Sequence, residues 1–299
     1  MSLALGVKAG EETFPSGGSP LGWGGRTVAV GMRKYWHVLN VGIQNTLVYR
    51  VNFLFRACFG LIPLTSTLFL WEAIFRGKGE GAMVQGYVYA QMVSYYLVVT
   101  LVDGLTAVAE DDWQIAADIK DGNISQFLLK PIDYLRYRLT LYFSGRLIYS
   151  VVAFIPIAIF ITWKWEFVSL PREPERWLWF AASTLMAGLL QFLISFTMAL
   201  LAFWVMEVST FIFILFAFEA LAGGQVFPLD ILPSAVMEVV RYTPFPYEMF
   251  FPVSIFLGRT QGPALWGGLA MQLCWVGAAF LIARTVWRRG IRRYTASGG

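Results

Sequence analysis

The sequence predicts an all-α integral membrane protein, and two observations lead to this fold class. Hydrophobic residues make up 57% of its 299 residues and charged residues only 14%, whereas soluble domains are about 25% charged. Several apolar windows also reach the ~20 residues that a helix needs to cross a hydrocarbon layer of about 30 Å. A single water-soluble core cannot bury so many apolar residues, so we expect a bundle of transmembrane helices.

The N-terminal part of the chain is expected to stay out of the bilayer core. Residues 1–26 are rich in Gly, Pro and Ser and lack a basic start followed by an apolar run, which predicts a disordered cytoplasmic tail and not a cleaved signal peptide. Across 27–50, apolar residues recur at spacings of three and four, which predicts an amphipathic helix lying in the membrane interface. These apolar residues are Val28, Met32, Trp36, Leu39, Ile43 and Leu47.

About six apolar segments are expected to span the membrane. The fifth is short, because Gly223, Gly224 and Pro228 interrupt its far end. A short helix is expected over 235–242, between the fifth and sixth spans. The expected spans are 51–75, 87–108, 139–162, 177–205, 210–227 and 264–286.

The placement of basic residues predicts the orientation of these spans. They gather before the first span, between the second and third, and after the last, which all share one side if there are six spans. The positive-inside rule places that side in the cytoplasm, with both termini. The residues are Arg26, Arg33, Lys34, Arg50, Lys120, Lys130, Arg136, Arg138, Arg288, Arg289, Arg292 and Arg293.

Several functional classes find no support in the sequence. It contains no phosphate-binding loop, no metal-spaced histidine pair and no nucleophile elbow, and its basic residues follow membrane topology and do not form a nucleic-acid footprint. His37 is the only histidine. Cys58 and Cys274 fall inside predicted spans, where buried apolar thiols are expected. We therefore expect no catalytic residue, metal site or cofactor in this chain. If the protein performs work, another chain must supply ATP or another source of energy.

The loop between the second and third spans carries more than a plain connector needs. It predicts an amphipathic helix over 110–120, which Gly122 is suited to end and after which Pro131 is suited to start the next helix. The helix offers an apolar ridge beside a charged rim. The ridge is Trp113, Ile115, Ala116 and Ile119, and the rim is Glu110, Asp111, Asp112, Asp118 and Lys120.

Together, the six spans, the N-terminal amphipathic helix and this loop resemble permease subunits of the ABC-2 type exporter family. The likeness runs from about residue 27 to the C terminus and is greatest to a six-span bacterial branch of uncharacterised or drug-type export permeases. The loop motif that carries it reads Ile119-Lys120-x-Gly122-x-Ile124-x-x-x-Leu128-Leu129-x-Pro131-Ile132.

This resemblance implies that 51–299 is a permease domain in the inner membrane of a bacterial cell. It implies re-entrant or external short helices between the fifth and sixth spans. It also implies a partner permease, in a homodimer or a heterodimer, and two ABC ATP-binding subunits that hold ATP and Mg. The helix over 110–120 would be the coupling helix that sits in a cleft of the ATPase, with an ordinary solvated connector as the alternative. The expected contact residues are Asp112, Trp113, Ile115, Ile119, Lys120 and Gly122.

Ionisable residues inside the spans are candidates for defined roles. Asp103 and Arg146 lie at similar depths, ~10 Å from the inner ends of two spans joined by one loop. We expect them to form a structural charge pair, with Arg56 as a competing partner.

Glu219 lies close to the middle of the fifth span. It is expected either to be protonated and bonded to a neighbouring helix, or to line the pathway near the dimer axis and help select the substrate. Gln225 and Phe227 are further pathway candidates. Small residues nearby would let a second permease approach closely. They are Ala217, Ala220, Gly223 and Gly224.

The expected function is ATP-driven export of an amphiphilic or hydrophobic substrate from the cytoplasm or the inner leaflet. A drug-like cation, a lipid and a glycolipid are the candidates. Two alternatives stay open: a mechanotransmitting membrane partner of an ATPase, and an ion-coupled secondary transporter. The first of these predicts a large outer domain, and the second favours inverted repeats, of which the sequence shows no convincing example.

Overall fold

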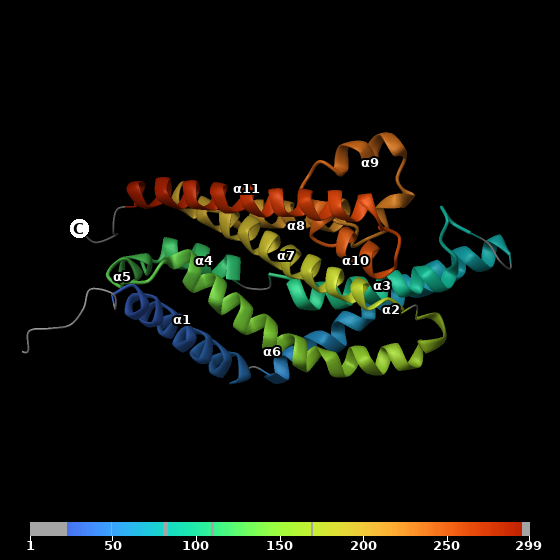
Figure 1. Ribbon diagram of the computed structural model, residues 1–299, viewed down its shortest axis with the longest axis horizontal. Coiled ribbons are helices and arrows are strands. Elements are labelled where there is room, and N and C mark those ends of the chain that lie inside the picture. Colours follow the sequence, from blue (N-terminus) through green and yellow to red (C-terminus); the bar gives the residue numbers. More distant parts are fainter. Residues whose placement is uncertain (1–22, 49, 80–82, 109–110, 169, 295–299) are drawn as a thin grey trace, which may run out of the picture.

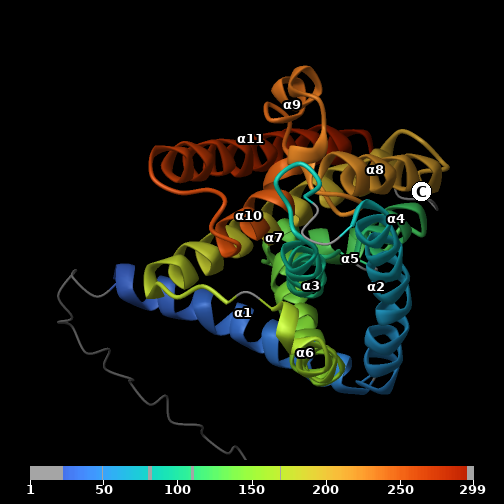
Figure 2. The same cartoon turned by 90° about the vertical axis from the view of Figure 1, so that its right-hand side faces the viewer.

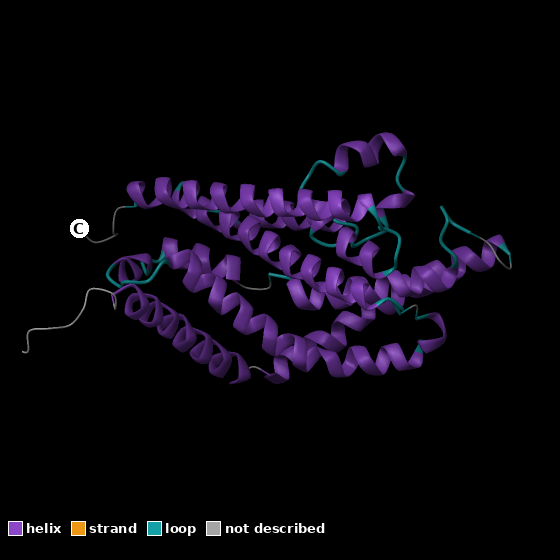
Figure 3. Cartoon of the chain, viewed as in Figure 1, coloured by secondary structure: helices purple, strands orange, loops and turns teal. Residues whose placement is uncertain are grey.

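A computed structural model describes residues 23–48, 50–79, 83–108, 111–168 and 170–294 (Figure 1). Within these residues the secondary structure is helical, as Figure 3 shows, and the only β-type pairing is the isolated bridge between Val84 and Tyr87. The predicted all-α class is therefore confirmed. The α-helices are α1 (Trp23–Val48), α2 (Arg50–Lys78), α3 (Tyr89–Thr106), α4 (Asp111–Lys120), α5 (Ile124–Leu128), α6 (Tyr134–Trp163), α7 (Pro174–Ala199), α8 (Ser209–Ala222), α9 (Ser234–Val240), α10 (Phe250–Phe256) and α11 (Pro263–Arg293).

Four helices in the described residues are long and apolar enough to cross a membrane. They correspond to the first, third, fourth and sixth predicted spans. The second and fifth predicted spans appear as shorter helices, α3 with 18 residues and α8 with 14 residues. At 1.5 Å per residue, α8 reaches about 21 Å, less than a hydrocarbon layer of about 30 Å. The four long spans are Val51–Lys78, Tyr134–Trp163, Pro174–Phe203 and Pro263–Arg293.

Helix α3 occupies the centre of the bundle, where it contacts α2, α6, α7 and α10 (Figure 2). Helix α11 packs along α7, and α1 packs along the first half of α6 (Figure 1). Gly42 permits the close approach of α1, since a Cβ there would lie 2.8 Å from Ser144 Oγ. The predicted amphipathic N-terminal helix is therefore packed against a long helix of its own chain.

The N-terminal helix begins earlier in the chain than the sequence predicted. Helix α1 already begins at Trp23, inside the segment 1–26 that was expected to be a tail, and residues 1–22 lie outside the described residues. The isolated histidine, His37, is exposed on α1, as a solvated or interfacial residue would be.

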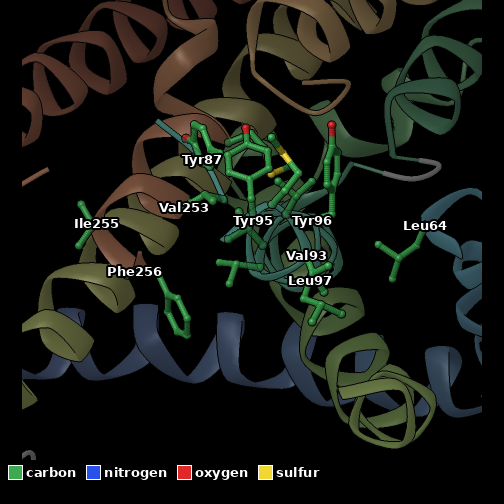
Figure 4. Packing of buried hydrophobic residues seen from close by; sticks show 14 of the residues in the cluster. Leu64, Tyr87, Val93, Tyr95, Tyr96, Leu97, Val253, Ile255 and Phe256 are labelled. Carbon is green, nitrogen blue, oxygen red and sulfur yellow. The ribbon is translucent and has the colours of Figure 1, made fainter. Parts of the chain in front are cut away.

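The largest cluster of buried side chains joins α3 to the segment that follows α8. Tyr95 and Tyr96 project from α3 on the same side (Figure 4). The Tyr95 hydroxyl donates to the Gly224 carbonyl at 2.5 Å, and the Tyr96 hydroxyl donates to the Val226 carbonyl at 2.8 Å. Gly224 has a φ of +89°, and a Cβ on it would lie 2.9 Å from the Tyr95 hydroxyl. The helix break is thus fixed by α3.

This packing corrects the role expected for two small residues. Gly223 and Gly224 were expected to let a second permease approach, but both are buried within their own chain. Their small size is needed there, because a Cβ on Gly223 would lie 2.3 Å from the Glu219 carbonyl oxygen.

The segment between α8 and α11 contains both an exposed helix and a buried one. Helix α9 lies where a short helix was predicted and has no buried residue, whereas six residues of α10 are buried. Asp230 ties this segment to the residues before α3, since it accepts from Tyr87 Oη at 3.0 Å and from Arg259 Nε at 2.9 Å. Burial, and then the Asp230 carboxylate, raise the pKa of Tyr87 well above its ordinary value.

The two cysteines differ from the expectation. Cys58 and Cys274 are free thiols as expected, but both are exposed and not buried. Each lies on an outward face of a long apolar helix, α2 or α11. The lipid-facing surface of a membrane protein is itself apolar, so a thiol is compatible with it. A position inside a predicted span therefore does not require that other parts of the protein bury the thiol.

Candidate functional site

Helix α4 forms where a cytoplasmic helix was predicted and ends as expected. Gly122 has a φ of +78°, the left-handed conformation that commonly follows a helix C terminus. The next expectation was wrong, because Pro131 does not start the following long helix. Helix α6 begins at Tyr134, and the Asp133 side chain caps it by accepting from the Arg136 backbone N–H at 3.0 Å.

Burial divides the predicted coupling residues into two groups. Ile115 is 1% exposed and Ile119 is 5% exposed, and both pack in a core cluster with side chains of α7. Trp113 is 43% exposed, and Lys120 is also exposed. Ile115 and Ile119 therefore anchor α4 to its own chain and are not available to an ATPase. The side chain of Asp112 lies outside the described residues.

A buried polar network joins α4 to α6, and it includes a residue that was expected on the charged rim. Asp118 forms an ion pair with Arg138, which is 4% exposed. Tyr134 donates to Asp118 Oδ2 at 2.9 Å, and Arg138 donates to Tyr134 Oη at 3.0 Å and to Gln114 Oε1 at 3.3 Å. Asp118 thus belongs to an internal contact and not to an outer rim.

The same network continues into α11. The Tyr134 ring stacks on Trp287 with centroids 4.9 Å apart and an interplanar angle of 10°. Arg284 of α11 also pairs with Asp133, at 2.5 Å between nitrogen and oxygen. In the sequence, Arg138 served only as a signal of topology, and Tyr134 was not singled out. Their role could not be predicted because it depends on α11, which is distant in sequence.

A second candidate site is a polar cavity of about 140 Å³ between α3, α7, α8 and the residues before α10. Three of its lining residues are carboxylic acids, and none is Lys, Arg or His. Glu219 and Gln225 line it, as pathway residues would, whereas Phe227 is not among the lining residues. The lining consists of Asp103, Ala107, Val108, Gln191, Ser195, Phe216, Glu219, Gln225, Glu248 and Met249.

The predicted charge pair is not in direct contact. Arg146 and Arg56 both act on Asp103 electrostatically, but the ion pairs within 4.0 Å in the described residues do not include one between Asp103 and Arg146. The Arg146 guanidinium lies over the Tyr149 ring at 5.1 Å, and Asp103 Oδ1 accepts from Gln225 Nε2 at 3.4 Å. Asp103 is therefore turned toward the cavity.

Glu248 is the site residue that sequence reasoning missed. It is 1% exposed, and neither of its carboxyl oxygens has a hydrogen-bond partner among the described residues. Glu219 lies close enough to act on it electrostatically. Glu248 lies in the segment between the fifth and sixth expected spans, and nothing in the sequence indicates that it is buried beside α8.

Helices long and apolar enough to cross a membrane, with a cavity between them, are typical of an integral membrane protein. The model of the ABC-2 family transporter protein family matches residues 61–298. The match covers most of the chain, so the protein belongs to this family and is an ABC-2 transporter permease. The resemblance seen in the sequence is thereby confirmed. No curated protein matches the sequence.

Proposed function

We propose that this chain is the permease subunit of an ATP-driven exporter that moves an amphiphilic or hydrophobic substrate out of the cytoplasm or the inner leaflet. Membership of the ABC-2 family supports association with ABC ATP-binding subunits. The observation that carries the proposal is the attachment of α4. Its buried face and the Arg138 network join it to α6, α7 and α11, so a displacement of α4 by a partner is transmitted to the long helices.

The exposed side of α4 supports the coupling role. Trp113 presents a large, exposed aromatic side chain in the first turn of α4, and aromatic anchors carry much of the free energy at protein interfaces. Lys120 adds an exposed charge in the last turn of α4. In this proposal Trp113 enters a cleft of the ATPase, and Ile115 and Ile119 hold the helix rigidly behind it.

Topology is part of the same proposal. The start of α1, helices α4 and α5, and the end of α11 lie at one end of the long axis (Figure 1). Basic residues gather there, among them Arg292 and Arg293 in the last turn of α11. We assign this end to the cytoplasm by the positive-inside rule, with α3 and α8 completing six spans in a bacterial inner membrane.

A second permease chain completes the proposed assembly. Helix α8 packs against little more than α7 and the residues around Phe245, and it exposes large apolar side chains. Phe213 is 73% exposed and Phe218 is 58% exposed. A partner permease covering this face would bring the acidic cavity, which α8 lines, close to the dimer axis.

Inside-out membrane vesicles test the transport activity. Vesicles containing the permease and its ATPase should take up compounds that co-purify with the complex when ATP is supplied, and should not do so with an ATPase variant that cannot hydrolyse ATP. Uptake driven by an imposed ion gradient without ATP would contradict the proposal and favour a secondary transporter. Mass spectrometry of the co-purified molecules identifies the substrate.

A further inference from the structure

The acidic cavity contains hydrogen-bond acceptors that the chain itself leaves unsatisfied. Both carboxyl oxygens of Glu248, Oε1 of Gln191 and Oγ of Ser195 are buried and have no partner in the described part of the chain. All three residues line the same cavity. Burying such groups without partners is costly, so a ligand that donates several hydrogen bonds would be favoured there.

The acidic residues of the cavity also favour a ligand with a positive charge. Glu219 from α8 and Glu248 face the cavity together and act on each other electrostatically. Asp103 of α3 is the third acid, and Arg146 of α6 and Arg56 of α2 act on it electrostatically. Helix α7 contributes only neutral groups, Gln191 and Ser195. When two carboxyl groups share a site, the negative charge of one disfavours ionisation of the other, and a cation bound between them favours the ionised form of both.

We infer that this cavity binds a protonated amine group of the transported compound, held by Glu248 and Glu219. This inference rests on the proposed transport function and names the substrate class. An ammonium group carries the required charge and donates N–H hydrogen bonds, which suit the unsatisfied oxygens of Glu248, Gln191 and Ser195.

Two further observations define the ligand. No group of three or more His, Cys, Asp or Glu residues in the described chain could hold a metal ion, so the acidic cavity suits an organic cation better. Its volume of about 140 Å³ admits a headgroup but is smaller than the ~300 Å³ or more of a site for a drug-sized molecule. The apolar remainder of the compound therefore extends out of the cavity, whose lining also includes the apolar residues Ala107, Val108, Phe216 and Met249.

Binding to the full-length chain in lipid nanodiscs, without the ATPase, tests the inference separately from transport. The probes are hexylammonium, hexyltrimethylammonium, which has the charge but no N–H, and hexanol, which is neutral. Hexylammonium should bind at least tenfold more tightly than the other two, after subtraction of binding to empty nanodiscs. Equal binding of the three probes, or no binding of hexylammonium, would overturn the inference and leave ATP-driven transport standing.

Matched variants locate the site. Glu248→Gln and Glu219→Gln should each weaken hexylammonium binding at least tenfold, whereas Glu238→Gln, on the exposed face of α9, should not change it. Thermal unfolding verifies that each variant is folded, and Glu219→Gln decides alone if Glu248→Gln does not fold. Unchanged binding in a folded variant of either cavity glutamate shows that the amine binds elsewhere.

Discussion

Exposure decides what each side chain of α4 can do. Ile115 and Ile119 are buried in their own chain, so Trp113 is the large apolar side chain that α4 presents outward. The amphipathic pattern predicted the helix and its apolar residues. It could not tell burial against the same chain from burial against a partner, because both require the same periodicity.

Replacing Trp113 with Ala should weaken association with the ATPase and leave the permease folded. Loss of an aromatic anchor at an interface commonly costs about 2 kcal/mol or more. Co-purification with the ATPase and substrate-stimulated ATP hydrolysis measure the effect. Trp163→Ala is the matched control, since Trp163 is 63% exposed and ends α6, which runs away from α4 toward the opposite end of the molecule (Figure 1). If the two variants behave alike, Trp113 is not part of the docking surface.

The cavity shows which charged residues a sequence can reveal. Glu219 could be identified because an acid in the middle of an apolar segment is conspicuous, and it does line the cavity. Glu248 could not, because its burial depends on how the segment after α9 folds back between α7 and α8. Likewise, similar depth suggested that Asp103 contacts Arg146, but depth says nothing of which face of each helix a side chain occupies.

At the scale of elements, the sequence predicted the long helices, but it predicted the breaks between helices only in part. Gly223 and Gly224 correctly predicted the end of α8. The contacts that fix the break could not be read from the sequence. Tyr95 and Tyr96, which donate hydrogen bonds to it, lie 129 and 130 residues before the carbonyl groups that accept them.

A methyl group at Gly224 should destabilise this contact. Gly224→Ala places an L residue at a φ of +89° and a Cβ 3.0 Å from Phe250 Cβ, so we expect a loss of roughly 1–3 kcal/mol. Thermal unfolding in detergent measures it. In the control Gly267→Ala, the new Cβ meets nothing within 4 Å, and an Ala in a helix interior should be neutral or stabilising. Equal unfolding temperatures for wild type and Gly224→Ala would refute the packing.

The joint between α4 and α6 leads to a second prediction for elements. Arg138→Met removes the cation from a pair in which Arg138 is buried, leaving Asp118 without its charge partner. We expect a loss of about 3 kcal/mol, faster hydrogen exchange in α4 and reduced coupling of ATP hydrolysis to transport. Arg136→Met removes an exposed arginine of the same helix and serves as the control. Similar exchange rates in the two variants would show that the network does not hold α4.

For the whole molecule, composition and the spacing of apolar segments were sufficient for the class and the long helices, and the loop motif carried the resemblance to the family. They did not show how the helices pack, because an apolar helix face is compatible with lipid, with a neighbouring helix or with a second chain. In the assembled molecule one end carries α4, and α4 packs against α7, which also lines the acidic cavity.

The central claim is that α4 docks an ATP-binding subunit, and site-specific photo-crosslinking tests it most directly. A photoreactive amino acid replaces Trp113 or, as a control, Trp163, in cells that produce both the permease and its ATPase. The adducts are identified by mass spectrometry. Our account predicts a crosslink to the ATPase from position 113 and none from position 163. ATPase adducts from position 163 with none from position 113 would contradict it.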